Sequence, residues 1–206
     1  MLEIINASLK LGGKELFKGL TFSLKEGDVV CIRGNSGCGK TTLLKAILGF
    51  LPLDEGVISC NGEPINAESA EVFRGMMTYI PQELALPSEN VADMVKLPFT
   101  LKANRERKYS KLDLMKEWGK LNLSEDLYDK KVSQLSGGQR QRIMISVSGM
   151  LGKLIILADE PTSALDAETS ALVADYFQCL AAKGAIVVAV SHDNNFANRC
   201  NMIVNI

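Results

Sequence analysis

Residues 34–42 constrain this chain more than any other stretch, because they fit the phosphate-binding pattern G-x-x-x-x-G-K-[ST]. A short apolar run, residues 28–32, precedes them, and a helix-forming segment, residues 43–48, follows. A strand, a glycine loop and a helix are the context in which this pattern binds phosphate, through inward-pointing N–H groups and the positive end of the helix dipole. We therefore predict a nucleotide site formed by Gly34, Asn35, Ser36, Gly37, Cys38, Gly39, Lys40, Thr41 and Thr42.

Three residues of this loop carry specific expectations. Lys40 is expected to lie against the β- and γ-phosphates, and Thr41 to offer its hydroxyl to Mg²⁺. The alternative, a glycine-rich turn without a ligand, is disfavoured by the surrounding strand and helix. A thiolate or an adduct at Cys38 would block nucleotide, but a small residue filling a loop position is the preferred interpretation, since reactivity requires a lowered pKa.

Length and composition favour one soluble domain that binds no nucleic acid. The chain has 206 residues, of which 47% are hydrophobic and 23% charged, and its net charge of −1 gives no basic face for a nucleic acid. No window approaches the roughly 18 to 20 apolar residues of a membrane span, and the first residues do not resemble a secretory signal, so we expect a cytoplasmic location. The five scattered cysteines are expected to be free thiols.

The pattern along the chain predicts an α/β core with a helical insertion. Residues 2–32 alternate as in an antiparallel meander, and the Asn61-Gly62 pair predicts a hairpin. Residues 76–80 read as a strand, and residues 154–158 and 185–190 as buried strands of a parallel sheet. Between residues 83 and 133 helix-friendly, charged sequence dominates, including the runs 102–108 and 111–118. For the basic run 102–108, a solvated helix face is preferred over an acidic partner.

Two further candidate groups follow the buried strands. Asp159 and Glu160 end the first strand, where one carboxylate would lie near Mg²⁺ and the other beside the γ-phosphate. Asp159 is therefore the expected metal-side residue and Glu160 the general base. His192, the only histidine, follows the second strand at the end where α/β sheets bind ligands. We expect it to hydrogen-bond the γ-phosphate, although a lone histidine is more often structural.

A second glycine-rich turn lies at residues 135–139. Its serine can cap the following helix, and the exposed N–H groups form an anion site that has no lysine. One nucleotide does not readily need two such sites in one chain. We therefore predict that this turn contacts the γ-phosphate of a nucleotide held by another copy, through Ser136, Gly137, Gly138 and Gln139.

Taken in chain order, these motifs resemble the nucleotide-binding domain of an ATP-binding-cassette (ABC) transporter, over essentially all 206 residues. The resemblance implies an α/β fold, with a RecA-like P-loop NTPase core, an antiparallel β subdomain and an inserted α-helical subdomain. Residues 1–83 and 151–206 would form the core and β subdomain, and residues about 84–150 the helical subdomain with the signature motif. The matches are Walker A at 34–42, the Q-loop at Gln82, the signature at 135–139, Walker B at 154–160, the D-loop at 163–166 and the switch histidine at His192.

The resemblance also implies partners and a mechanism. Two copies would sandwich two ATP molecules, each between Lys40 and its loop on one copy and Ser136 to Gln139 on the other. ATP binding would close the dimer, and hydrolysis would reopen it. Gln82 would reach the Mg²⁺ or the attacking water and, with the helical insertion, couple closure to transmembrane permease subunits. The protein would then lie on the inner face of the cell membrane through its permease.

Some features depart from the family or leave its role open. Leu11 stands where relatives stack an aromatic residue on adenine, so the preference for adenine is open. The layout of residues 91–99 resembles a bacterial group linked to metal or iron export. A soluble ABC-type ATPase acting on ribosomes or in DNA repair is the alternative function. A small-molecule kinase is a third, which the signature turn and His192 disfavour.

Overall fold

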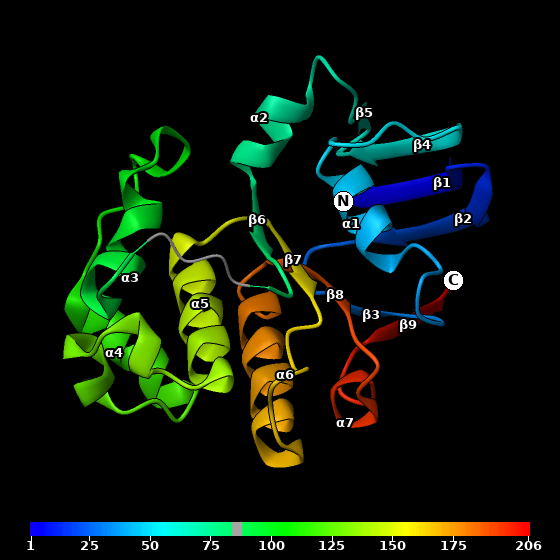
Figure 1. Ribbon diagram of the computed structural model, residues 1–206. Helices are drawn as coiled ribbons and strands as arrows, with labels where there is room; N and C mark the ends of the chain where they lie inside the picture. Colours follow the sequence, from blue (N-terminus) through cyan, green and yellow to red (C-terminus); the bar gives the residue numbers. More distant parts are fainter. Residues whose placement is uncertain (84–87) are drawn as a thin grey trace.

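The computed structural model describes residues 1–83 and 88–206, and it places their strands in two sheets (Figure 1). In this part of the chain the antiparallel sheet has the order β2-β1-β4-β5 and the parallel sheet the order β6-β7-β8-β3-β9. The antiparallel strands are β1 (Leu2–Leu11), β2 (Lys14–Leu24), β4 (Glu55–Cys60) and β5 (Glu63–Pro64). The parallel strands are β3 (Val29–Arg33), β6 (Met77–Ile80), β7 (Ile155–Asp159), β8 (Ile186–Val190) and β9 (Met202–Asn205).

Helices cover both faces of the parallel sheet. Between the strands lie α1 (Lys40–Ile47), α2 (Ala70–Gly75), α6 (Ala167–Ala181) and α7 (Asn194–Ala197). The segment between β6 and β7 contains α3 (Val91–Thr100), α4 (Lys111–Lys120) and α5 (Gly137–Leu151), with the 3₁₀ turns η1 (Lys102–Asn104), η2 (Glu125–Asp129) and η3 (Val132–Gln134). None of the helices in the described residues is long and apolar enough to span a membrane.

Side-chain alternation along the parallel strands divides the core into two clusters. In β8, Ile186 and Val188 pack with α1 and the antiparallel sheet, whereas Val187 and Ala189 pack with α5 and α6. Successive strand residues point to opposite faces, so strands buried on both faces are apolar throughout. The architecture is therefore three-layered, with the antiparallel sheet and α1 on one face and helices on the other (Figure 1).

The predicted fold class is confirmed, and most expected strands are present. The hairpin between β4 and β5 turns through Asn61 and Gly62, whose φ angles of 52° and 85° fit the turn type that Asn-Gly favours. The prediction of an antiparallel meander up to residue 32 was wrong in its last strand. β3 pairs in parallel with β8 and β9, because its first four residues are all buried and it needs cover on both faces.

The helical expectation for residues 102–108 was also wrong. Only η1 forms there, and the next helix, α4, begins at Lys111. The amide Nδ2 of Asn104 donates to the carbonyl of Pro98 at 2.8 Å, and this side chain is buried. Local capture of a backbone carbonyl by an asparagine competes with helix formation. The short elements α2, α7 and β9 were also not predicted from the sequence.

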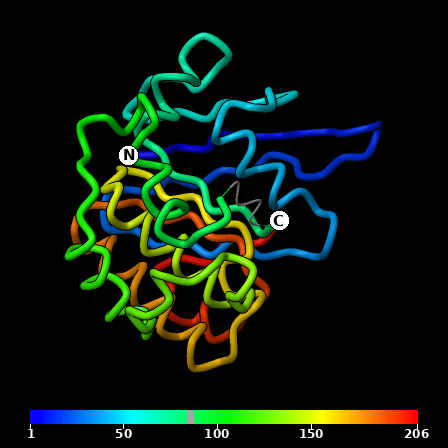
Figure 2. The backbone as a smooth tube through the Cα atoms, turned by 60° about the vertical axis from the view of Figure 1, so that its left-hand side comes forward, coloured from blue at the N-terminus to red at the C-terminus, as the bar shows by residue number. Residues whose placement is uncertain are grey.

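The helices between β6 and β7 gather on one side of the molecule. Figure 2 shows this green segment on the side away from the tip of the β1–β2 hairpin. Its Leu114 and Trp118 are fully buried in the same cluster as α5 and α6. The division of the chain into a core (residues 1–83 and 151–206) and a helical part (about 84–150) stays a prediction. Its first boundary, near residue 84, lies outside the described residues.

Candidate functional site

The parallel sheet brings the predicted site residues to one edge. β3, β7 and β8 are neighbours, with Asp159 paired to Val190 and Val190 to Ile32. The segments that follow these strands, which carry the phosphate loop, Glu160 and His192, therefore emerge side by side, as expected for the carboxyl ends of parallel strands. Together with Gln82, which follows β6, they line a hollow of about 900 Å³.

The phosphate loop is held in a conformation that glycine alone adopts easily. Gly39, which caps α1, has a φ of 102°, and a Cβ at this position would lie 2.8 Å from the Cβ of Leu16 on β2. The Nζ of Lys40 donates to the carbonyls of Gly34 and Asn35 at 2.9 and 3.0 Å. The lysine is thus folded back on its own loop. Its ammonium has three N–H donors, and phosphate oxygens can accept from them in place of the carbonyls.

The surroundings of Asp159 fit a residue that binds a metal ion. The side chain is 2% exposed, and its Oδ2 accepts a hydrogen bond from the hydroxyl of Tyr79 at 3.3 Å. Its Oδ1 is buried without a hydrogen-bond partner among the described residues. An unpaired buried carboxylate oxygen is costly unless a ligand completes it, and Mg²⁺ in nucleotide sites is held by one or two carboxylates plus phosphates. The carboxylate therefore fits Mg²⁺, as does the nearby hydroxyl of Thr41, which also lines the hollow.

Glu160 and His192 lie in contact beside this carboxylate. The Oε1 of Glu160 is 3.3 Å from the Nε2 of His192, and the glutamate side chain is 14% exposed. Its backbone has an unusual φ of 48°, and its N–H donates to the carbonyl of Val190 at 2.9 Å. A left-handed non-glycine residue is typical of functional sites, where the surroundings impose the conformation. Burial raises the pKa of the Glu160 carboxyl, and the charges of His192 and Lys40 oppose that rise.

We expect this raised pKa to appear in the pH dependence of turnover. A general base acts in its ionised form, and lowering the pH through its pKa removes that form. The acid limb of kcat/KM for hydrolysis should therefore lie above 4.5, the ordinary glutamate value. The profile is measured on protein whose circular dichroism is unchanged over the same pH range. An acid limb at or below 4.5 would contradict the assignment of Glu160 as the base.

Two leucines contribute apolar surface to the hollow. Leu11 and Leu16 both line it, and Leu11 is 58% exposed. Lys14 reaches the loop from the same strand pair, and its Nζ donates to the carbonyl of Gly37 at 3.3 Å. Leu11 is also the residue that the family resemblance aligns with the aromatic side chain that stacks on the base. No aromatic side chain lines this hollow in the described part of the chain, so base stacking has no partner within it.

Ser136 caps the following helix as predicted, but the signature turn does not line the hollow. Ser136 caps α5 by accepting from the N–H of Gln139 at 3.1 Å, and the Oε1 of Gln139 accepts from the N–H of Ser136 at 2.9 Å. A Cβ on Gly138 would lie 2.8 Å from the Cδ2 of Leu165, so glycine permits this close packing. Leu165 lines the hollow, whereas none of the four predicted turn residues, Ser136, Gly137, Gly138 and Gln139, is among its lining residues.

Several contacts that support the site have no signal in the sequence. The hydroxyls of Thr162 and Ser191 lie 3.2 Å apart in the core, and the Ser191 hydroxyl also accepts from the N–H of Asp193 at 3.1 Å. Arg33 donates to the carbonyl of His192 at 3.4 Å. These contacts hold the segment that carries His192, and no motif signals them, because they depend on strands far apart in sequence.

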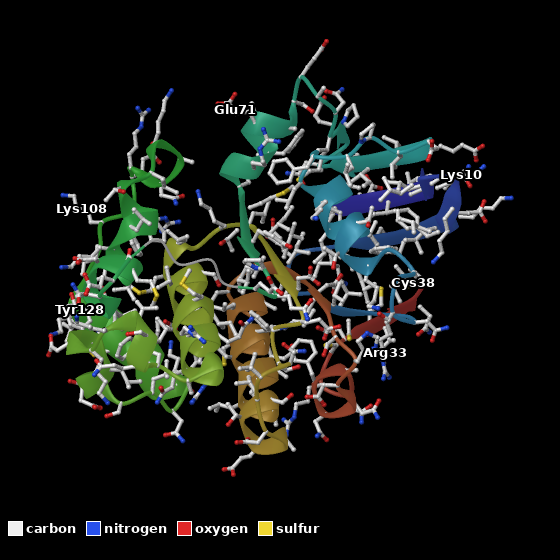
Figure 3. All side chains as sticks on the ribbon, in the orientation of Figure 1. Lys10, Arg33, Cys38, Glu71, Lys108 and Tyr128 are labelled. Atoms are coloured by element: carbon white, nitrogen blue, oxygen red, sulfur yellow. The ribbon has the colours of Figure 1, made fainter. Side chains whose placement is uncertain are left out.

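Cys38 lies in the phosphate loop beside the carboxyl end of β3. Figure 3 shows it near Arg33, on the side of the molecule opposite Lys108 and Tyr128 of the helical segment. The thiol is half-buried and forms no disulfide in the structure. The interpretation of Cys38 as a small residue that fills the loop stays a prediction.

Comparisons with known proteins agree on one family. The model of the family described as ABC transporter matches residues 17–163. The taurine import ATP-binding protein TauB of Escherichia coli strain K12 is 35% identical over 198 residues, which cover 94% of this chain and 74% of TauB. The spermidine/putrescine import ATP-binding protein PotA of Fusobacterium nucleatum is 36% identical over 167 residues, 81% of this chain and 44% of PotA.

Solved structures give the same result for the fold. The dimeric, post-hydrolysis state of the ATP-binding cassette MJ0796, bound to ADP and Pi, matches with a TM-score of 0.84 at 28% identity, and the match covers 100% of this chain and 94% of that one. A cassette described as the ATP-binding protein of an ABC transporter from Pyrococcus furiosus matches with a TM-score of 0.84 at 26% identity, covering 99% of this chain and 96% of that one.

Proposed function

The chain belongs to the ABC transporter family, as an ATP-binding subunit and ATPase, and from this premise we propose that it powers transport by closing as a dimer around ATP. One observation carries the proposal. The signature turn, Ser136 to Gln139, presents a capped helix N-terminus yet contributes nothing to the hollow that contains Lys40, Glu160 and His192. A second copy that supplied this turn would complete the site.

In the proposed site each residue group has one task. Lys40 leaves the carbonyls of Gly34 and Asn35 and neutralises the β- and γ-phosphates. Glu160 orients a water molecule and takes its proton, while His192 donates to a γ-phosphate oxygen. A bound Mg²⁺ would be held by Thr41, Asp159 and Gln82 and would neutralise phosphate charge as hydrolysis proceeds. The partner's turn adds N–H donors at a helix N-terminus, where charge accumulates in the transition state.

The closed dimer depends on the γ-phosphate. A ligand shifts an open–closed equilibrium only by its difference in affinity for the two states. ATP satisfies this condition in the proposed arrangement, because its γ-phosphate is contacted from both copies only when the dimer is closed. Hydrolysis and phosphate release remove those contacts, so the dimer opens. This cycle supplies the mechanical step that permease subunits would use.

The proposal also includes transmembrane partners and a transported molecule. TauB and PotA are import proteins by name, which supports import for this chain over the metal or iron export expected from residues 91–99. Metal or iron export stays a prediction that none of these relatives supports.

Affinity purification tests the transporter assignment. Tagged Glu160→Gln protein is purified with ATP from detergent-solubilised cells of its source, with Lys40→Ala protein as the matched control. A polytopic membrane protein in stoichiometric amount is the expected companion. Ribosomal or DNA-repair components without any membrane protein would overturn the transporter assignment in favour of a soluble ABC-type ATPase.

Leu11, one of the leucines that line the hollow, leads to a prediction of increased affinity for ATP. Leu11→Tyr should tighten ATP binding about fivefold, because stacking of a base on an aromatic side chain contributes about 1 kcal/mol at its lower end. Isothermal titration calorimetry measures the change, with Leu112→Tyr as the control, since Leu112 is 69% exposed on α4. Equal affinities for the two variants would show that the base does not lie against Leu11.

A further inference from the structure

We propose that Tyr79 is a positioning residue for the metal site, whose hydroxyl holds Asp159 so that the free carboxylate oxygen faces the nucleotide. The inference rests on the proposed function, because it takes Asp159 as the metal-side carboxylate. It assigns a task to a residue of β6 that lies outside the loop and turn motifs described above.

The contact between Tyr79 and Asp159 gives the two carboxylate oxygens of Asp159 different surroundings. The Tyr79 hydroxyl donates to Oδ2 of Asp159 at 3.3 Å, while Oδ1 is buried without a hydrogen-bond partner in the described ranges. With Oδ2 tethered, rotation of the carboxylate would break a hydrogen bond to a charged group. Partners of this kind fix the orientation of metal ligands and affect metal affinity strongly.

Strand register explains why Tyr79 can make this contact. β6 and β7 run in parallel with Tyr79 beside Leu157, and Asp159 lies two residues beyond Leu157 on the same face of the sheet. The Tyr79 ring packs on the cluster that contains Leu157, on the α1 side of the sheet. The ring is therefore anchored in the core, and its hydroxyl is carried to the edge where the phosphate loop lies.

The same short segment also leads to Gln82. Only Ile80 and Pro81 separate Tyr79 from Gln82, which lines the hollow. A proline between them limits the backbone freedom of this link. The Tyr79 hydrogen bond thus joins the ends of β6 and β7. Asp159 lies at the end of β7 and Gln82 follows β6, and both are expected to bind the metal ion.

Binding of Mn²⁺ in the nucleotide complex tests the proposal without measuring turnover. Tyr79→Phe keeps the ring and removes only the hydroxyl. With protein in excess over ATP in the Glu160→Gln background, the Mn²⁺ dissociation constant measured by electron paramagnetic resonance should rise about tenfold. The affinity for ATP in EDTA should change less than twofold. The melting temperature should change by less than about 2 °C.

Two further variants make each outcome decisive. Tyr109→Phe is the matched control, because it removes a hydroxyl that donates to Tyr128 at 3.1 Å in the helical segment, and it should leave Mn²⁺ binding unchanged. Asp159→Asn should weaken Mn²⁺ binding more than Tyr79→Phe does. If Asp159→Asn weakens binding and Tyr79→Phe does not, the positioning role is wrong and the proposed function stands. If neither variant weakens it, the metal-side assignment of Asp159 is itself wrong.

Discussion

Replacing Glu160 by glutamine is expected to stop hydrolysis while leaving ATP binding intact, and so to trap a stable dimer. Glutamine has nearly the same size but cannot accept the proton of an attacking water. Loss of a general base costs about 10²- to 10⁴-fold in rate. ATP then persists in the site, and its γ-phosphate keeps the contacts that the closed state requires.

The dimer is measured by size-exclusion chromatography with light scattering, with ATP and with ADP. We expect twice the monomer mass with ATP and the monomer mass with ADP. Glu71→Gln is the matched control, since Glu71 is exposed on α2 and lies away from the phosphate loop (Figure 3). Hydrolysis that survives in Glu160→Gln would assign the base to another residue, and a monomer at saturating ATP would exclude ATP-driven dimerisation.

Replacing Lys40 by alanine is expected to weaken nucleotide binding about a hundredfold or more. Lys40 is 7% exposed, and its ammonium makes two hydrogen bonds to loop carbonyls, which phosphate oxygens would replace. Each hydrogen bond to a charged group contributes about 1.5 to 3 kcal/mol, and two of them account for this loss. Hydrolysis should fall below detection as a consequence.

Lys45→Ala is the matched control for this variant, because Lys45 lies on the same helix with its side chain exposed. Calorimetric titration with ATP compares the two, and thermal melting without nucleotide confirms that both are folded. Tight ATP binding by Lys40→Ala would mean that the phosphates lie elsewhere than the loop at residues 34–42. Equal losses in both variants would point to general destabilisation of α1.

The phosphate loop and the edge of the sheet could be predicted because their signals are local. A glycine loop between a strand and a helix specifies its own conformation, as Gly39 with its φ of 102° illustrates. Asp159 and His192 each follow a run of buried residues directly. Parallel strands bring such positions to one edge whatever their distance in sequence.

The rest depends on strand register and on packing between distant segments. β3 looks like the end of a meander, and only its partners β8 and β9, which lie far along the chain, place it in the parallel sheet. The hydrogen bond between Tyr79 and Asp159 joins residues 80 positions apart. Glu160 has a positive φ and donates its N–H to Val190, which lies on the neighbouring strand β8. None of these has a pattern that can be recognised in the sequence.

A mixing experiment tests most directly the central claim that each nucleotide is shared between two copies. One partner carries Lys40→Ala and the other Gly137→Glu, both in the Glu160→Gln background. The nearest atom to a Cβ on Gly137 would be Ala164 Cβ at 3.5 Å, and a carboxylate is favourable at a helix N-terminus, so this variant should fold. Its charge would repel the γ-phosphate presented by a partner.

Native mass spectrometry of the two variants, alone and mixed with ATP, gives the answer. Alone, each should remain monomeric, the first without nucleotide and the second with one ATP. Mixed, they should form a heterodimer with a single ATP, held by Lys40 of one copy and the intact signature turn of the other. A mixture that contains only monomers, with ATP bound to the Gly137→Glu chain, would contradict the shared site.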